Sequence, residues 1–302
     1  MIFKELFVLY IFIFLGWLLG RIKPEIVSGS KVLSFLLVNL FLPSKVFLTF
    51  SQSFTVTYLK ENYATFFISV CILLLLSLIA IPLSAMLTGE RYQKKVYRYS
   101  FAITNYAYMG YALIENLLGK GALANMITFC IPFAMYTYTV GYSLLTGEGK
   151  IAKKLLNTMT VSIVLGCVFG LVGIPVPSVI STVLSSASAC TGALSMLLTG
   201  LVIASFSPKE LLPDGGTLVF SGLRLVALPA LVLGICKLLS MAFTLPPAIY
   251  PFAVIVACMP CGLNTVVFPR LVGEDCRQGA RMVLYSHVFS MVTIPLWLMI
   301  LI

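Results

Sequence analysis

Ten apolar segments follow one another along the chain, separated by short polar connections. A helix needs about 20 residues to cross the hydrocarbon core of a bilayer, and each segment approaches or exceeds that length. The segments are expected at 5–20, 32–51, 63–87, 98–118, 122–146, 155–173, 181–205, 217–242, 250–269 and 281–301. The longest polar pieces between them lie at 88–98, 147–154 and 207–216. This pattern predicts an all-α integral membrane protein with ten transmembrane helices.

Composition agrees with this interpretation. Hydrophobic residues make up 60% of the 302 residues, charged residues only 10%, and the mean hydropathy is +1.05. Soluble domains carry roughly 25% charged residues, so a soluble fold could not hide this much apolar surface. The net charge of +10 would suit nucleic acid, but the basic residues lie in short clusters between apolar segments. Such clusters indicate orientation and contact with anionic lipid headgroups, and no nucleic-acid partner is expected.

Basic residues are divided unequally between alternate connections. Fourteen lie in the connections after the first, third, fifth, seventh and ninth segments: Arg21, Lys23, Lys31, Arg91, Lys94, Lys95, Arg98, Lys150, Lys153, Lys154, Lys209, Arg270, Arg277 and Arg281. The opposite side has Lys4, Lys60 and Lys120, with Lys237 near it. Because basic residues concentrate on the cytoplasmic side, we expect a multi-pass protein of the cytoplasmic (inner) membrane with both termini outside the cytoplasm.

The ten segments divide into two sets of five. The polar piece 147–154 is expected to be a cytoplasmic loop between a first repeat, 1–146, and a second repeat, 155–302. An odd number of crossings in each half makes the two repeats inverted. Inverted repeats are typical of secondary transporters, whose sites lie near the middle of the membrane where discontinuous helices meet. The fourth and ninth segments should then be the interrupted ones.

Both of these segments contain residues suited to a break. The fourth reads "ITNYAYMGYALIENLLG" (103–119), with Asn105 and Gly110, and the ninth contains Pro260, Gly262 and Asn264 in "ACMPCGLNTVVFPRLVG" (257–273). Proline removes a backbone donor, and glycine permits an unwound backbone. The new helix starts would present N–H groups to an anion, and each asparagine could donate to a carboxylate. Alternatively, these residues only kink the two helices.

Three titratable residues inside apolar segments have more than one interpretation each. Glu115 is either a proton-coupling carboxyl group or a partly solvated group near the outer end of its segment, beside Lys120. Lys45 either attracts an anion or pairs with Glu115, unless its stem reaches up to the outer surface. His287, the only histidine, either senses protons or makes a hydrogen bond between helices, which we favour. No set of residues has the spacing of a metal site, and no cofactor is expected.

Cys258 and Cys261 form a Cys-Met-Pro-Cys sequence that resembles the active site of a thiol oxidoreductase. Both residues fall in the middle of an apolar segment, whereas a redox dithiol must be reachable from water. The remaining six cysteines are scattered singly and offer no second pair to pass electrons on. We therefore interpret the two residues as small buried side chains and expect no enzyme activity.

The chain also resembles the auxin efflux carrier family, a group of ten-span transporters. The resemblance covers nearly the whole sequence and rests on the order and spacing of several motifs. Among them are "LFLPSKVF" (40–47), "TNYAYMGYALIENLLG" (104–119), "RLVALPALVLG" (224–234) and "MPCGLNTVVFPRLVG" (259–273). Family members often have proline where this chain has Ala112, Thr158 and Ala193. The proline missing at 112 leaves Gly110 as the residue expected to permit the break in the fourth segment.

The resemblance implies a fold like that of sodium/proton antiporters and bile-acid symporters, in which unwound points of helices 4 and 9 cross and bind organic anions. By position, Asn105 and Gly110 would match the first unwound point, and Pro260 and Asn264 the second. Pro43 would match a proline in the helix beside the site. Segments one, two, six and seven would form one moving unit. The resemblance also implies that a homodimer is plausible.

Together these features predict a secondary transporter, not an enzyme, that moves a small organic anion (a mono- or dicarboxylate) by alternating access, with protons or sodium as coupling ion. A sodium-coupled symporter of the bile-acid type is the first alternative. An intramembrane thiol redox enzyme is the second.

Overall fold

The computed structural model describes residues 2–147, 157–242 and 249–301. This part of the chain is built from helices and contains no β-strand. The first half consists of α1 (Ile2–Ile22), η1 (Pro24–Gly29), α2 (Ser30–Leu36), η2 (Leu37–Phe41), α3 (Leu42–Ser53), α4 (Val56–Leu87), α5 (Arg91–Ala102), η3 (Tyr106–Gly110), α6 (Tyr111–Tyr136), η4 (Thr137–Gly141) and α7 (Tyr142–Thr146). The second half consists of α9 (Thr158–Val172), α10 (Ser178–Ala204), α11 (Gly215–Gly222), η5 (Leu223–Ala227), α12 (Leu228–Ala242), α13 (Ile249–Cys258), α14 (Asn264–Leu271) and α15 (Arg277–Leu301).

Seven helical segments of the described residues are long and apolar enough to cross a membrane. Large apolar side chains on them face outward: Phe67 is 62% exposed, Leu78 64% and Met299 67%. Such a large apolar surface is unfavourable in contact with water, whereas it suits contact with lipid tails. The all-helical composition and the apolar exterior agree with an integral membrane protein.

A helix break lies between the predicted fourth and fifth segments. Gly119 has φ 82° and ψ −178°, which interrupts α6. This positive φ favours glycine, because it has no Cβ to clash with the backbone. The chain therefore turns at Gly119, between the predicted segments 98–118 and 122–146. The predicted loop 147–154 lies outside the described residues apart from Gly147, and so do Lys150, Lys153 and Lys154.

The prediction of a polar connection over 88–98 is wrong for most of its length. Helix α5 begins at Arg91, so the connection is only three residues long. The helix is amphipathic: Val96, Tyr97 and Tyr99 are buried on one side, while its charged side chains lie on the other. Average hydropathy marks where apolar residues begin, and it misses the polar first turns of a helix that has one polar face.

Helices from the two halves of the chain form one tightly packed group. Helix α1 packs along α10, and α3 packs along α9. A Cβ added at Gly200 of α10 would lie 2.0 Å from the carbonyl oxygen of Ile13, and one at Gly16 of α1 would lie 2.1 Å from that of Leu197. The backbones touch because these residues have no side chain. We call α1, α2, α3, α9 and α10 the first helix group.

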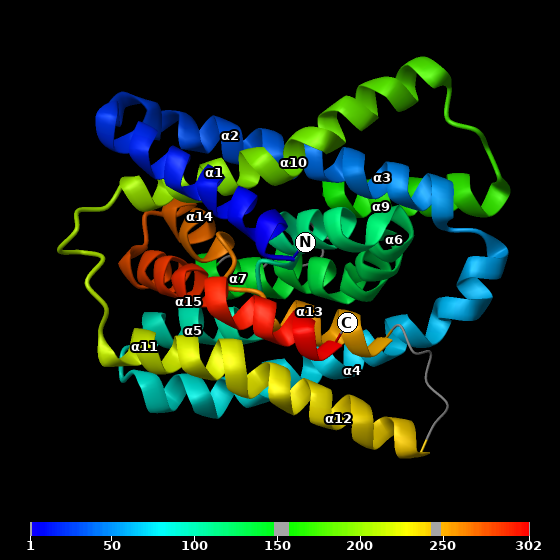
Figure 1. Cartoon of the computed structure of the whole chain (residues 1–302). Helices are drawn as coiled ribbons and strands as arrows, with labels where there is room; N and C mark the ends of the chain where they lie inside the picture. Colours follow the sequence, from blue (N-terminus) through cyan, green and yellow to red (C-terminus); the bar gives the residue numbers. More distant parts are fainter. Residues whose placement is uncertain (1, 148–156, 243–248, 302) are drawn as a thin grey trace.

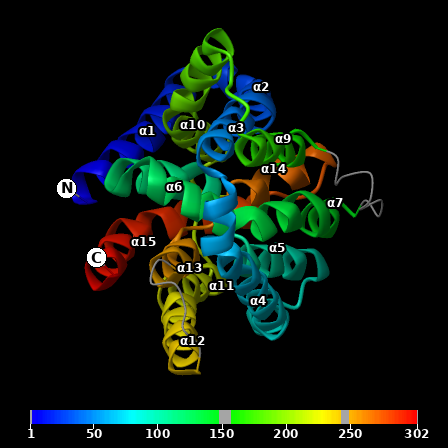
Figure 2. The same cartoon turned by 90° about the vertical axis from the view of Figure 1, so that its right-hand side faces the viewer.

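The remaining helices pack around the two interrupted segments. Figure 2 shows the first helix group on one side of the molecule and α4, α5, α11, α12, α13 and α15 on the other, with α6, α7 and α14 between them. Figure 1 likewise places α11 and α12 along the edge opposite α1, α2, α3 and α10. Segments one, two, six and seven, which were expected to form one moving unit, thus pack together in the structure; their movement as a unit stays a prediction.

Candidate functional site

Two helix breaks meet in the interior of the protein. The first separates α5, which ends at Ala102, from η3, which begins at Tyr106. The second separates α13, which ends at Cys258, from α14, which begins at Asn264. Each break leaves backbone N–H and C=O groups without partners inside their own helix, and in a membrane these groups must find partners in the protein.

Each break supplies hydrogen bonds to the other. The backbone N–H of Asn105 donates to the carbonyl oxygen of Pro260 at 2.8 Å, and Thr104 and Cys261 form an antiparallel bridge. The Thr104 hydroxyl donates to the carbonyl oxygen of Val256 at 3.0 Å. The two breaks therefore stabilise one another. We call the region formed by residues 103–105 and 259–263 the helix crossing.

The prediction that Gly110 permits the first break is wrong. Gly110 has helical dihedral angles, φ −64° and ψ −45°, and the break lies earlier, at residues 103–105. A Cβ at Gly110 would lie 2.8 Å from the terminal methyl carbon of Met126, so the residue serves close packing. No glycine or proline occupies the first break. Its conformation depends on contacts with the second break, and a proline at position 112 is not required for it.

Pro260 and Gly262 lie inside the second break, as predicted. Pro260 contributes the carbonyl that Asn105 binds, and a Cβ at Gly262 would lie 3.2 Å from the carbonyl oxygen of Thr104. The absence of a side chain at Gly262 lets the two backbones approach. Between these residues, the N–H of Cys261 donates to the Ser286 hydroxyl at 2.9 Å.

The structure links His287 directly to Asn105. Both residues are buried, at 3% and 2% exposure. His287 Nδ1 lies 2.7 Å from the carbonyl oxygen of Val283, and because a carbonyl only accepts, Nδ1 carries the hydrogen. The other nitrogen, Nε2, then accepts from the Asn105 amide nitrogen at 3.1 Å. This is the hydrogen bond between helices that we favoured. The Asn105 amide oxygen has no hydrogen-bond partner among the described residues.

The starts of η3 and α14 surround one small cavity of about 20 Å³. It is lined by Ile103, Thr104, Asn105, Tyr106, Ala107, Tyr108, Thr137, Tyr138, Gly262, Leu263 and Asn264. The start of a helix carries partial positive charge, although at α14 the N–H groups of Thr265 and Val266 already donate to the carbonyl oxygens of Gly262 and Leu263. Two such ends converge here without a charged side chain. Asn105 and Asn264, the two predicted polar residues, both line this cavity.

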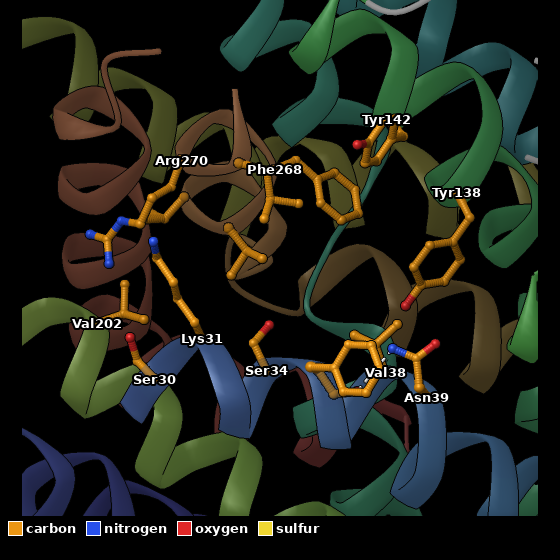
Figure 3. Close-up of a pocket in the computed structure, with 14 residues that line it drawn as sticks. Ser30, Lys31, Ser34, Val38, Asn39, Tyr138, Tyr142, Val202, Phe268 and Arg270 are labelled. Atoms are coloured by element: carbon orange, nitrogen blue, oxygen red, sulfur yellow. Dashed lines mark hydrogen bonds between the residues drawn. The ribbon is translucent and has the colours of Figure 1, made fainter. Parts of the chain in front are cut away.

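A larger cavity of about 260 Å³ lies beside the crossing, between the first helix group and α14 (Figure 3). Lys31 and Arg270 lie together at one end of it, and Tyr138 and Asn39 at the other. Tyr138 lines both this cavity and the small one. The larger cavity therefore leads from a basic surface toward the crossing. Sequence reasoning missed Tyr138, because a tyrosine in an apolar segment carries no signal of its own.

Lys45 and Glu115 form an ion pair that joins α3 to α6. The Lys45 side chain is only 6% exposed and that of Glu115 is 29% exposed, so Lys45 does not reach the surface, and the partly solvated interpretation of Glu115 fits better. Both residues line a third cavity, of about 220 Å³, together with Lys120. Pro43 is buried in α3 two residues before Lys45 and does not line the small cavity at the crossing.

Cys258 and Cys261 are fully buried at the crossing. The Cys261 sulfur lies 3.5 Å from the Ser100 hydroxyl and 3.6 Å from that of Thr265. These contacts suit packing, and nothing in them resembles a dithiol open to solvent. Among the residues that the structure describes, no group of three His, Cys, Asp or Glu side chains could hold a metal ion.

Arg224, which sequence reasoning missed, also lies beside the helix crossing. It is 0% exposed, in η5, and its Nη1 donates to the carbonyl oxygen of Phe101 at 3.2 Å. The sequence did carry a signal, because Arg224 is a charged residue well inside the apolar segment 217–242. A charged residue in such a position is costly and is commonly functional.

Comparison with known protein families agrees with this architecture. The family model described as "Membrane transport protein", which represents the auxin efflux carrier family, matches residues 1–298. No curated protein matches the chain. The match extends over almost the entire sequence, including both breaks of the crossing. The chain therefore belongs to the auxin efflux carrier family and is a membrane transporter.

Proposed function

We propose that the protein is a secondary transporter that moves a small organic anion, a mono- or dicarboxylate, across the cytoplasmic membrane by alternating access. The observation that carries this proposal is the pair of helix starts, η3 and α14, that converge on one cavity at the crossing. Their N–H groups provide positive potential without a fixed charge. A carboxylate can bind to such donors and still leave, as transport requires.

The proposed fold has ten crossings in two inverted repeats, 1–146 and 155–302. The equivalent positions of the two breaks support it, since α5 and η3 correspond to α13 and α14. The packing of α1 on α10 and of α3 on α9 supports it too. The first pair joins the first segment of one repeat to the second segment of the other, and the second pair does the same with the repeats exchanged, as two related halves would.

The proposed orientation places the basic connections in the cytoplasm and both termini outside. Three hydrogen bonds bring these connections together: Arg21 donates to Phe206 O at 2.7 Å, Arg270 to Ser205 Oγ at 2.9 Å and Arg281 to Glu210 O at 2.7 Å. A cluster of this kind on one face is what the positive-inside rule expects. The cavity that contains Lys31 and Arg270 would then open toward the cytoplasm.

Alternating access would occur between the first helix group and the helices of the crossing. Both larger cavities described above lie between these two sets: one contains Lys31 and Arg270, and the other contains Lys45 and Glu115. The ion pair joins the two sets on the side away from the basic cavity. The bond between His287 and Asn105 provides a route for protons to influence the site, because a protonated Nε2 could no longer accept from the amide.

Uptake of labelled carboxylates into proteoliposomes tests the proposal. Malate, malonate, lactate and indole-3-acetate would be offered with and without imposed pH, sodium and voltage gradients. We expect saturable uptake of an acid that Asn105→Ala and Asn264→Ala abolish, because each removes a polar group from the small cavity. Asn62→Ala is the matched control, since Asn62 lies on α4 and its amide donates to Tyr58 O at 3.0 Å.

Wild-type uptake by both crossing variants would place the substrate site elsewhere. Sodium-dependent uptake would favour the bile-acid type of symporter. A protein that inserts and folds but moves no acid under any gradient would overturn the proposed substrate class.

A further inference from the structure

Arg224 is a buried cation whose charge is not matched by an acid. Its guanidinium makes one hydrogen bond, to the carbonyl oxygen of Phe101, while Nε and Nη2 have no hydrogen-bond partner among the described residues. The ion pairs found in the described part of the chain do not include Arg224. Removing one partner of a buried ion pair costs several kcal/mol, so an unpaired buried arginine requires another source of stabilisation.

The position of Arg224 identifies that source. Phe101 lies in the last turn of α5, and the turn that carries Arg224, η5, packs against α13. The end of α13 lies beside that of α5, because the Thr104 hydroxyl donates to Val256 O in the last turn of α13 at 3.0 Å. Helices α5 and α13 both end at the crossing. The final carbonyl groups of a helix carry partial negative charge, and a cation there is favourable. Two such ends act on Arg224 together.

The two kinds of helix end at the crossing therefore have different surroundings. The amino-terminal ends, at η3 and α14, face the small cavity. The carboxyl-terminal ends, at α5 and α13, are close to Arg224. In transporters built from broken helices, unwound carbonyls and carboxyl-terminal helix ends are the groups that coordinate sodium ions or protons. Here a side chain of the protein supplies the positive charge at these ends.

The surrounding helices hold Arg224 in this place. It belongs to η5, a π-helical turn between α11 and α12, and η5 packs against α13 and α15. The indole N–H of Trp297 on α15 donates to the carbonyl oxygen of Leu225 at 2.8 Å. The neighbouring residue is thus fixed by a hydrogen bond from another helix, which keeps the turn and its guanidinium group at the crossing.

We propose that Arg224 is a built-in counter-cation for the carboxyl-terminal ends of α5 and α13, and that it takes the place a sodium ion would have there. It acts as a positioning residue, because it stabilises the crossing without touching the substrate. Two consequences follow. The folded crossing needs no sodium ion, and anion transport does not depend on sodium. The second consequence rests on the proposed function, whereas the first does not.

Thermal unfolding of the purified full-length protein tests the first consequence. The wild-type midpoint should be the same in sodium chloride and choline chloride. Arg224→Ala should unfold at a lower temperature and should be rescued by guanidinium ions at about 10 mM, far below the molar concentrations that unfold proteins. We expect its midpoint to rise by about 3 °C when guanidinium reaches ten times its dissociation constant for the vacated site.

Leu225→Ala is the matched control, because Leu225 is equally buried in the same turn but carries no charge. It should lose stability and gain none from guanidinium. Rescue of both variants to the same extent would overturn the proposal. A sodium-specific rise in the wild-type midpoint would overturn it as well, and that measurement needs no variant to fold.

Uptake measurements test the second consequence. Arg224→Lys keeps the charge and should retain at least a tenth of the wild-type rate, while Arg224→Met should lose more than nine-tenths of it. Wild-type uptake by a stably folded Arg224→Met would refute the need for the cation. If the wild type moves none of the acids, the proposed function fails, and the unfolding midpoints still decide the role of Arg224.

Discussion

Removing the charge of Glu115 tests whether the ion pair with Lys45 holds the first helix group against α6 and keeps the cavity beside the pair closed. In Glu115→Gln the ammonium group of Lys45 loses its carboxylate while its side chain remains 6% exposed in the wild-type geometry. Breaking a fully buried pair costs about 3–5 kcal/mol, whereas a surface pair contributes about 0–1 kcal/mol. Glu115 is 29% exposed, so the cost falls between these limits.

The cavity beside the ion pair brings the expected cost of breaking it closer to the value for a surface pair. Its volume of about 220 Å³ has room for several water molecules, each of which occupies about 30 Å³ in the liquid. Water in this cavity can therefore solvate part of the charge of the Lys45 ammonium group after the carboxylate is removed. We expect a loss of about 1–2 kcal/mol in the free energy of unfolding, which corresponds to a decrease of about 2–5 °C in the thermal midpoint.

Thiol labelling measures whether the cavity opens. Single cysteines at Ser188, in the cavity of the ion pair, and at Ser34, in the basic cavity, would be introduced into a variant without the native cysteines. Because the pair joins the first helix group to α6, Glu115→Gln should accelerate labelling at position 188 and slow it at position 34. The exchange Lys45→Glu with Glu115→Lys should restore both rates. Unchanged rates and an unchanged midpoint in Glu115→Gln would refute the reasoning.

Two glycine substitutions test the close approaches. Gly262→Ala places a Cβ 3.2 Å from Thr104 O, so we expect a loss of about 1 kcal/mol and slower uptake, while Gly234→Ala, whose Cβ would meet no atom within 4 Å, should change neither. Gly200→Ala places a Cβ 2.0 Å from Ile13 O and should cost about 3 kcal/mol, compared with Gly222→Ala in open space. Thermal unfolding measures both, and equal midpoints for each variant and its control would contradict the geometry.

The features that could be predicted from the sequence are those that depend on local chemistry. Apolar segments mark the helices, because lipid selects composition at every position of a spanning helix. The gap between the apolar segments 98–118 and 122–146 marks the turn that the structure places at Gly119. Pro260 and Gly262 mark the second break, because proline removes a backbone donor and glycine permits an unwound backbone. The pairing of Lys45 with Glu115 was one of the stated alternatives, since two opposite charges inside apolar segments have few other partners.

The features that could not be predicted depend on residues far apart in the chain. The first break lies at 103–105 because its backbone groups bond to the second break more than 150 residues away. Nothing in the local sequence indicates this position, and the glycine at 110 led to a predicted break too late in the segment. Tyr138 belongs to the site because two cavities meet at its side chain. Only the folded arrangement shows such a position.

The two sides of the crossing carry different polar residues: asparagines line the small cavity, whereas an arginine lies at the carboxyl-terminal helix ends. A fixed cation beside the small cavity would bind an organic anion strongly and would slow its release, whereas transport requires binding that is weak enough to reverse. The small cavity has Asn105, Asn264 and two helix starts, and no charged side chain lines it. Arg224 lies instead at the carboxyl-terminal ends of α5 and α13, where it offsets their partial negative charge. The cation thus stabilises the crossing, at which we propose that the anion binds, without itself holding the anion.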